Sequence, residues 1–168
     1  MLQNPEQPCV TIGFCRSRGI LSRAIEWFGA GHYSHVTTLM PDRVSVIDAR
    51  LHGGVKRRPV SYLKNTQVTW VDLLCDSELQ ALKVYSFLTA QIGKRYDITG
   101  IIDFVTGYNR DPNWKTKSAW FCDELAAAAC EYAGLVTRPW FAPTFRLTPG
   151  AFAAMVSQRR IRFSTFKI

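Results

Sequence analysis

The sequence lacks any stretch that approaches the roughly 18 uncharged apolar residues of a membrane-spanning helix. Its start, MLQNPEQPCV, has neither the basic region nor the apolar region of a secretory signal peptide. Glycine (11) and proline (8) are too scarce for a collagen-like or repetitive chain. Disorder is excluded too, because 47% of the residues are hydrophobic and only 20% are charged. We therefore expect one globular domain, residues 1–168, in a cytoplasmic protein without a transmembrane segment.

Cysteine is present, but not in the patterns that bind metals or build disulfide frameworks. There are five cysteines and three histidines, and no Cys-x-x-Cys pair occurs. An odd number of irregularly spaced cysteines argues against a disulfide scaffold, and so few ligands argue against a zinc site. We expect no metal and no other cofactor. Most of the cysteines should be small buried residues, which leaves one at most as a candidate for chemistry.

Negative charge is the other scarcity. The chain has 13 Asp and Glu against 21 Lys and Arg, which gives a net charge of +8. Such a balance predicts an anionic partner, such as nucleic acid, lipid headgroups or cell-wall polymer. The basic groups Lys56-Arg57-Arg58 and Arg159-Arg160-Arg162 suit such a partner, or are simply solvated. No known nucleic-acid-binding motif occurs, so we expect no specific nucleic acid partner.

The pattern of apolar residues predicts an α+β domain. Strands are predicted over 10–14 and 67–72, a hairpin over 33–49 with its turn at Pro41-Asp42-Arg43, and an outer strand over 160–168. Helical segments are predicted over 20–28, 62–63, 77–92 and 122–132, and from Pro149 onward.

The helix over 77–92 carries the clearest signals. Ser77 and Gln80 have the spacing of a capping box, and Gly93 ends the segment. We expect its buried stripe to consist of large apolar residues at helical spacing, namely Leu79, Leu82, Tyr85, Leu88 and Ile92.

Cys122 stands where a predicted helix begins, directly after Trp120 and Phe121. A helix N-terminus offers free amide donors and partial positive charge, which stabilise a thiolate and then an oxyanion. The alternative is a buried helix residue, as we expect for Cys130, because free cysteine is among the most buried residue types.

Two residues of the predicted hairpin could complete a catalytic set. His35 lies in mid-strand, a poor place for a histidine whose ring nitrogens are unused, although a satisfied core histidine is the alternative. Asp48 follows thirteen residues later on the partner strand, where cross-strand neighbours meet. Its carboxylate could fix the imidazole tautomer as in a triad, or it is a solvated aspartate at the end of a strand.

Taken together, these motifs resemble those of a known family, the circularly permuted papain-like hydrolases of the NlpC superfamily. This is the YiiX/YebB-like branch, which is related to lecithin retinol acyltransferase. The resemblance spans roughly residues 10–155 and follows the order Tyr33-Ser34-His35-Val36, Val46-Ile47-Asp48-Ala49, Gly53-Gly54-Val55, Tyr96-Asp97 and Trp120-Phe121-Cys122-Asp123-Glu124-Leu125. It implies a papain-like fold of the permuted NlpC type, in which an antiparallel sheet packs against helices and the nucleophile begins a helix.

The resemblance also implies roles for individual residues. Cys122 is the expected nucleophile, His35 the general base and Asp48 the residue that orients the base. Tyr96 matches a tyrosine that lies near the oxyanion in related enzymes, or it packs in the core. Two departures stand out: Asp123 replaces the usual serine after the cysteine, and relatives often carry Glu or His where this chain has Asp48.

Two functions follow as hypotheses. The first is a cysteine hydrolase or acyltransferase that cleaves an amide or ester through a thioester on Cys122. Its expected substrate is an anionic component of the cell envelope, either a peptidoglycan peptide or a lipid. The second is a catalytically inactive papain-like binding module that uses its basic surface to hold anionic lipid or nucleic acid. The sequence determines neither the bond cleaved nor the oligomeric state.

Overall fold

The protein is an α+β domain in the computed structural model, which describes residues 7–16, 33–97, 118–136, 148–157, 161–163, 166 and 168. Neighbouring strands of the main sheet are antiparallel, in the order β4-β3-β2-β1-β5-β8. They are β1 (Cys9–Arg16), β2 (His35–Leu39), β3 (Ser45–Arg50), β4 (Gly54–Pro59), β5 (Gln67–Leu74) and the short edge strand β8 (Ile161–Phe163).

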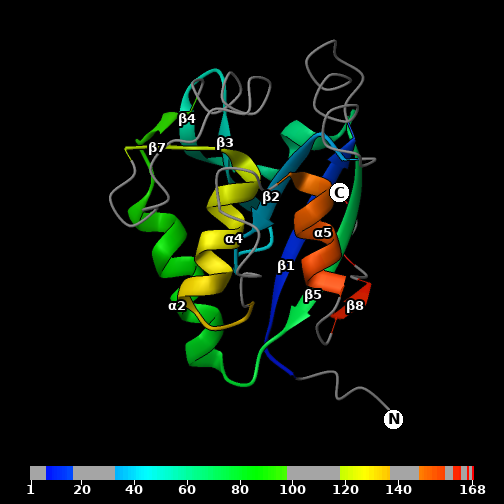
Figure 1. Cartoon of the computed structure of the whole chain (residues 1–168). Helices are drawn as coiled ribbons and strands as arrows, with labels where there is room; N and C mark the ends of the chain where they lie inside the picture. The colour runs from blue at the N-terminus through cyan, green and yellow to red at the C-terminus, as the bar shows by residue number, and fades with distance from the viewer. Residues whose placement is uncertain are drawn as a thin grey trace.

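Three α-helices cover one face of this sheet (Figure 1). They are α2 (Glu78–Ala90), α4 (Cys122–Tyr132) and α5 (Pro149–Ser157). A 3-10 turn, η1 (Val60–Leu63), follows β4, and the two short strands β6 (Arg95–Tyr96) and β7 (Ala119–Trp120) form a separate parallel pair. The α+β class and the antiparallel sheet packed against helices are therefore confirmed.

The core lies between the sheet and α4. Alternate residues of β1, such as Ile12 and Phe14, point to the helices, and the Phe14 ring lies 5.8 Å from that of Phe152 on α5. Helix α4 is buried over most of its length, and four successive alanines, Ala126 to Ala129, let it lie close to both the sheet and α2. This packing fixes where the first residue of α4 lies relative to β2 and β3.

A smaller apolar cluster covers the opposite side of the strands. It contains Cys15, Leu39, Val46, Leu63 and Trp70, with Tyr62 packed against it. Gly13 is required there because a Cβ atom at this position would come within 2.6 Å of the Trp70 ring. His35 lies opposite Cys15 of this cluster, so the side chains of His35 and Asp48 lie on this side of the sheet, whereas α4 packs on the other side.

Most local predictions from the sequence are confirmed within the described residues. The hairpin forms with its turn at 41–44, where the Asp42 side chain accepts hydrogen bonds from the amides of Val44 and Ser45. Ser77 caps α2 by accepting from the Gln80 amide, and Thr148 caps α5 by accepting from the Ala151 amide. The outer strand is observed over 161–163 only, and the helix predicted over 20–28 lies outside the described residues.

The predicted buried stripe of α2 is wrong in part. Leu79, Leu82 and Ile92 are exposed, at 62%, 55% and 43% of their surface. The residues that α2 buries are Ala81, Val84 and Leu88. Both sets have helical spacing, so periodicity alone does not choose between them. The choice is made by α4, whose alanine-rich surface approaches α2 closely and fits the set that contains the smaller side chains.

The described helices are also informative about membranes. None of them is both long enough and apolar enough to span a bilayer.

Candidate active site

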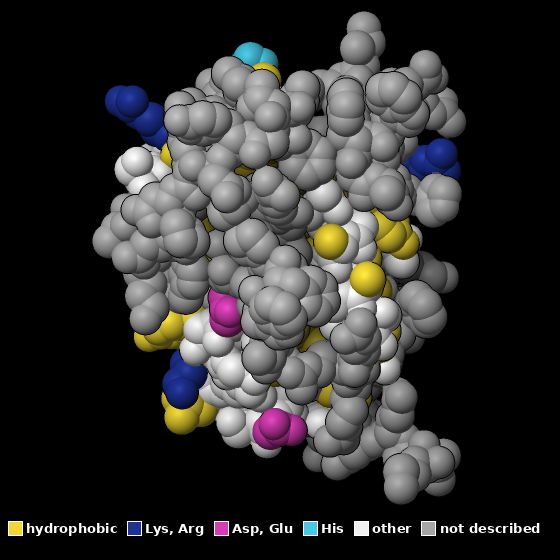
Figure 2. Space-filling model, in the orientation of Figure 1, with side chains coloured by type: hydrophobic (Ala, Val, Ile, Leu, Met, Phe, Trp, Pro, Cys, Tyr) yellow, Lys and Arg dark blue, Asp and Glu magenta, His cyan; other side chains and the backbone are white. Residues whose placement is uncertain are grey.

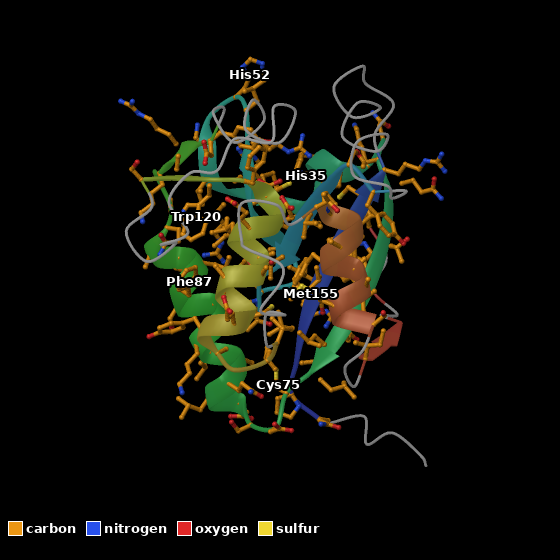
Figure 3. All side chains as sticks on the ribbon, in the orientation of Figure 1. His35, His52, Cys75, Phe87, Trp120 and Met155 are labelled. Carbon is orange, nitrogen blue, oxygen red and sulfur yellow. The ribbon has the colours of Figure 1, made fainter. Side chains whose placement is uncertain are left out.

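Three of the predicted site residues come from elements that meet at one end of the domain. His35 is the first residue of β2, Asp48 lies in β3, and Cys122 is the first residue of α4. Figure 3 shows His35 on β2, the strand against which α4 packs. Helix α4 begins here because Phe121 has extended backbone angles and its amide hydrogen-bonds the Glu124 carboxylate at 3.4 Å.

His35 and Asp48 form a close pair. The distance from His35 Nε2 to Asp48 Oδ2 is 2.7 Å, and their side chains are 12% and 0% exposed. A carboxylate only accepts hydrogen bonds, so Nε2 of His35 carries the proton of this bond. In the neutral imidazole, the other nitrogen, Nδ1, is then free to act as a base.

Three further side chains hold the Asp48 carboxylate. Arg50 Nε donates to Oδ2 at 3.2 Å, the Tyr62 hydroxyl donates to Oδ2, and Arg58 donates to Oδ1. Burial alone would raise the pKa of Asp48, but the hydrogen bonds from His35 and Tyr62 and the charge of Arg58 outweigh it and bring the pKa to about 2. Asp48 is therefore an ion at any physiological pH.

The Cys122 sulfur lies next to β2. The backbone amides of Val36, the residue after His35, and of Asp123 act on the sulfur and favour its thiolate form. The thiol is only 5% exposed, and burial together with the nearby Asp123 carboxylate raises the pKa of Cys122 well above its ordinary value, although the two amides act to lower it. Cys122 at rest is therefore a neutral thiol.

The structure brings the predicted residues together unequally. His35 and Asp48 are in direct contact, and Cys122 contacts the strand that carries His35. Within the described part of the chain, no hydrogen bond joins the His35 ring to the Cys122 sulfur, which instead lies 3.7 Å from Asp123 Oδ1. His52 is a separate residue in the turn between β3 and β4, away from His35 (Figure 3).

Tyr96 also lies near the sulfur. Its strand β6 pairs with β7 so that Tyr96 is level with Trp120, and its ring packs edge-on against Phe121 at 5.2 Å. Burial and the nearby Cys122 and Asp123 raise the pKa of Tyr96, so its hydroxyl remains protonated. A protonated phenol can donate a hydrogen bond next to Cys122.

Asp123 is the most unusual group of the site. It is buried, its Oδ1 accepts from nearby groups, and its Oδ2 has no hydrogen-bond partner. Burial and the charge of the adjacent Glu124 raise the pKa of Asp123 to about 8, against hydrogen bonds from the amides of Asp123 and Glu124. Because those amides belong to the first turn of α4, this carboxyl occupies donors that a helix N-terminus would otherwise offer to a ligand.

Two charges of the predicted basic surface are paired with carboxylates of the same chain. Arg57 pairs with Asp42 at 2.7 Å, and Arg58 is bound to Asp48 with only 14% of its side chain exposed. On the face shown in Figure 2, the described Lys and Arg side chains lie apart from one another. Of the second basic group, positions 159 and 160 lie outside the described residues.

Sequence reasoning missed Arg50, Arg58 and Tyr62 as partners of Asp48. The only signal for Arg50 was its position two residues after Asp48, which puts both on the same side of β3. Arg58 and Tyr62 are ten and fourteen residues away, and nothing local identifies them.

Cys15 is the other cysteine near the pair, because it lies opposite His35 on β1 and the charges of Arg50 and Asp48 act on its pKa. All five are free thiols, and burial raises the pKa of Cys15 to about 12 and of Cys130 to about 12. Among the described residues, no group of three or more His, Cys, Asp and Glu side chains is arranged to hold a metal ion.

Comparison with known proteins identifies no relative: no family model matches the chain, and no curated protein matches it.

We predict that Asp48→Asn lowers the free energy of unfolding by about 3 kcal/mol at neutral pH, because two guanidinium groups lose their buried counter-ion. The folded pKa of about 2 lies below the ordinary 3.8, so the stabilisation by this carboxylate is complete above pH 4 and is lost as the pH falls toward 2. Urea unfolding measured from neutral to acid pH tests both statements. The control is Asp76→Asn, which removes an exposed carboxylate at the surface and should cost little. Equal losses in the two variants would contradict the prediction.

We predict that Asp123→Asn makes Cys122 more reactive toward iodoacetamide, and increasingly so as the pH rises through about 8. Below that pH Asp123 is protonated and the two proteins should react alike. Above it the wild-type carboxylate raises the thiol pKa, and its removal should increase the thiolate fraction about tenfold for each unit by which that pKa falls. Peptide mass spectrometry measures the rate at Cys122. Asp76→Asn, which removes an exposed carboxylate beside Cys75, should leave this rate unchanged.

Proposed function

We propose that this chain is a cysteine-dependent hydrolase or acyltransferase that cleaves an amide or ester bond through a thioester on Cys122. We also propose that its α+β architecture is the permuted papain-like type that the sequence motifs resemble. The observation that carries the proposal is the position of Cys122. It begins α4 beside the backbone of Val36, whose amide favours its thiolate form, and the residue before Val36 is a histidine paired with a buried carboxylate.

The first step is a proton transfer. With Nε2 of His35 donating to Asp48, Nδ1 is left to take the proton from the Cys122 thiol. Because the thiol pKa is raised, Cys122 keeps its proton at rest and the transfer accompanies the attack on the substrate. Asp48 then faces an imidazolium ion, which its negative charge stabilises.

The second step is bond formation. The sulfur electron pair forms a bond to the carbonyl carbon of the substrate, and the carbonyl π electrons move to oxygen. We assign the stabilisation of the resulting oxyanion to the Cys122 amide at the start of α4 and to the protonated hydroxyl of Tyr96, on whose pKa Cys122 and Asp123 act. The partial positive charge of the helix end favours the same negative oxygen.

The third step releases the leaving group. The carbonyl re-forms as the bond to the amine or alcohol breaks, and this group takes the proton from Nδ1 of His35. The acyl group remains on Cys122 as a thioester. In a hydrolase, water attacks the thioester carbon while Nδ1 takes a proton from it. The bond from that carbon to the Cys122 sulfur then breaks, the acid leaves, and the sulfur takes the proton back from Nδ1. In an acyltransferase, an amine or alcohol takes the place of the water.

We propose a cell-envelope peptide or a lipid as the acyl donor. The net charge of +8 favours either anionic substrate. The alternative, an inactive module that binds through a basic surface, gains no support from Arg57 and Arg58, whose charges are matched by Asp42 and Asp48.

We predict that the wild-type protein releases a stoichiometric burst of nitrophenolate from the activated ester p-nitrophenyl acetate and retains an acetyl group on Cys122. Cys122→Ala should abolish the burst. His35→Gln should slow it by roughly 10²–10⁴-fold, the usual contribution of a general base. Stopped-flow absorbance measures the burst, and peptide mass spectrometry locates the acetyl group.

The matched control is Cys75→Ala, which removes another buried thiol that has no histidine–carboxylate pair. It should leave the burst intact. A burst of full size in Cys122→Ala, or an acetyl group found on Cys9 or Cys75 instead, would overturn the proposed function.

A further inference from the structure

Arg50 stands next to the base of the candidate site. Its Nε and the Nε2 of His35 donate to the same oxygen, Oδ2 of Asp48, at 3.2 and 2.7 Å. Two donors that share one acceptor atom must be close neighbours. A group that binds to Arg50 therefore lies beside the imidazole of His35.

The guanidinium of Arg50 is held in place but is not saturated. Its plane lies over the Tyr62 ring, with 4.5 Å from the guanidinium carbon to the ring centre, and among the described residues it contacts Asp48 and Tyr62. An arginine carries five N–H donors, and its contacts with the described residues use only some of them. The side chain is 36% exposed, which leaves it accessible to a ligand.

Arg58 provides a contrast from the same cluster. Besides the Asp48 carboxylate, its guanidinium donates to the backbone carbonyls of Asp48, Lys56 and Gly54, and only 14% of the side chain is exposed. Arg58 therefore has a structural role. Of the two arginines on this carboxylate, Arg50 has fewer contacts with the described residues and is more exposed to solvent.

The charge of the cluster points the same way. Two guanidinium groups surround one carboxylate, so the cluster has an excess positive charge even when His35 is neutral. Lys56, which pairs with Asp48 across β3 and β4, adds to it. A fixed, planar and under-used guanidinium in such a field fits two oxygen atoms of one anionic group.

We propose that Arg50 is the anion-binding residue of this site and holds a carboxylate or phosphate group of the ligand next to His35. The assignment of that ligand as the substrate rests on the proposed function, whereas the binding of the oxyanion itself does not. The substrate class is thereby narrowed to acyl donors that carry an oxyanion near the bond to be cleaved. Asp48 and Tyr62 fix the orientation of Arg50 before binding, so Arg50 loses little conformational freedom when the anion binds.

The test is an NMR titration of the arginine Nε–Hε resonances of the full chain with inorganic phosphate and, in a second arm, with acetate. Sodium chloride at matched ionic strength is the reference. Arg50→Lys keeps the charge but not the planar pair of donors, and Arg50→Gln removes both. Arg57→Gln is the matched control, since Arg57 lies on the neighbouring strand and is paired with Asp42 instead.

We expect saturable shifts at Arg50 with an oxyanion and not with chloride. Arg50→Lys should bind about tenfold more weakly, as judged by the shifts of backbone amides near Asp48, because bidentate bonding is lost. Arg57→Gln should bind like the wild type. A tighter response to phosphate would identify a phosphate-bearing ligand, and an equal or tighter response to acetate a carboxylate-bearing one.

Shifts that follow ionic strength alone, or oxyanion binding that survives Arg50→Gln, would overturn this inference. Neither result depends on the chemistry of Cys122, which the ester burst measures separately. A protein that is acetylated on Cys122 but shows no oxyanion response at Arg50 would refute the role of Arg50 and leave the proposed function standing.

Discussion

The buried carboxylate of Asp48 is the interaction on which the rest of this end of the domain depends. It accepts hydrogen bonds from His35 on β2, Arg50 on β3, Arg58 on β4 and Tyr62 in η1. Burying a single charge without partners costs several kcal/mol. Four donors from four successive elements offset that cost. The same bonds therefore fix the local geometry of the hairpin and hold the imidazole in one orientation.

The surroundings of Cys122 divide into groups that favour a thiolate and groups that oppose it. The amides of Val36 and Asp123 favour the negative sulfur, whereas burial and the Asp123 carboxylate oppose it. Burial and the carboxylate outweigh the amides, so the pKa of Cys122 is raised and the site holds a thiol, not a preformed thiolate. Chemistry at Cys122 therefore depends on removal of the thiol proton during the attack, and this gives the histidine–carboxylate pair its importance in the proposed mechanism.

The sequence was sufficient where local rules decide the structure. Alternation and the turn residues around Asp42 predicted the hairpin, and the spacing of Ser77 and Gln80 predicted the start of α2. It failed where long-range packing decides. Leu79 was expected in the core because it belongs to a stripe of large apolar residues at helical spacing. Helix α2 has a second such stripe, and the close approach of α4 selects that one for burial. Arg58 and Tyr62 could not be identified as partners of Asp48, because their contacts depend on the register of β4 and the position of η1.

The most direct test of the account is ¹⁵N NMR of the His35 imidazole in the wild type and in Cys122→Ala. The account predicts that neutral His35 carries its proton on Nε2, facing Asp48, and that loss of the thiol shifts the Nδ1 resonance. A neutral ring protonated on Nδ1, or a ring whose Nδ1 resonance does not respond to removal of Cys122, would contradict it.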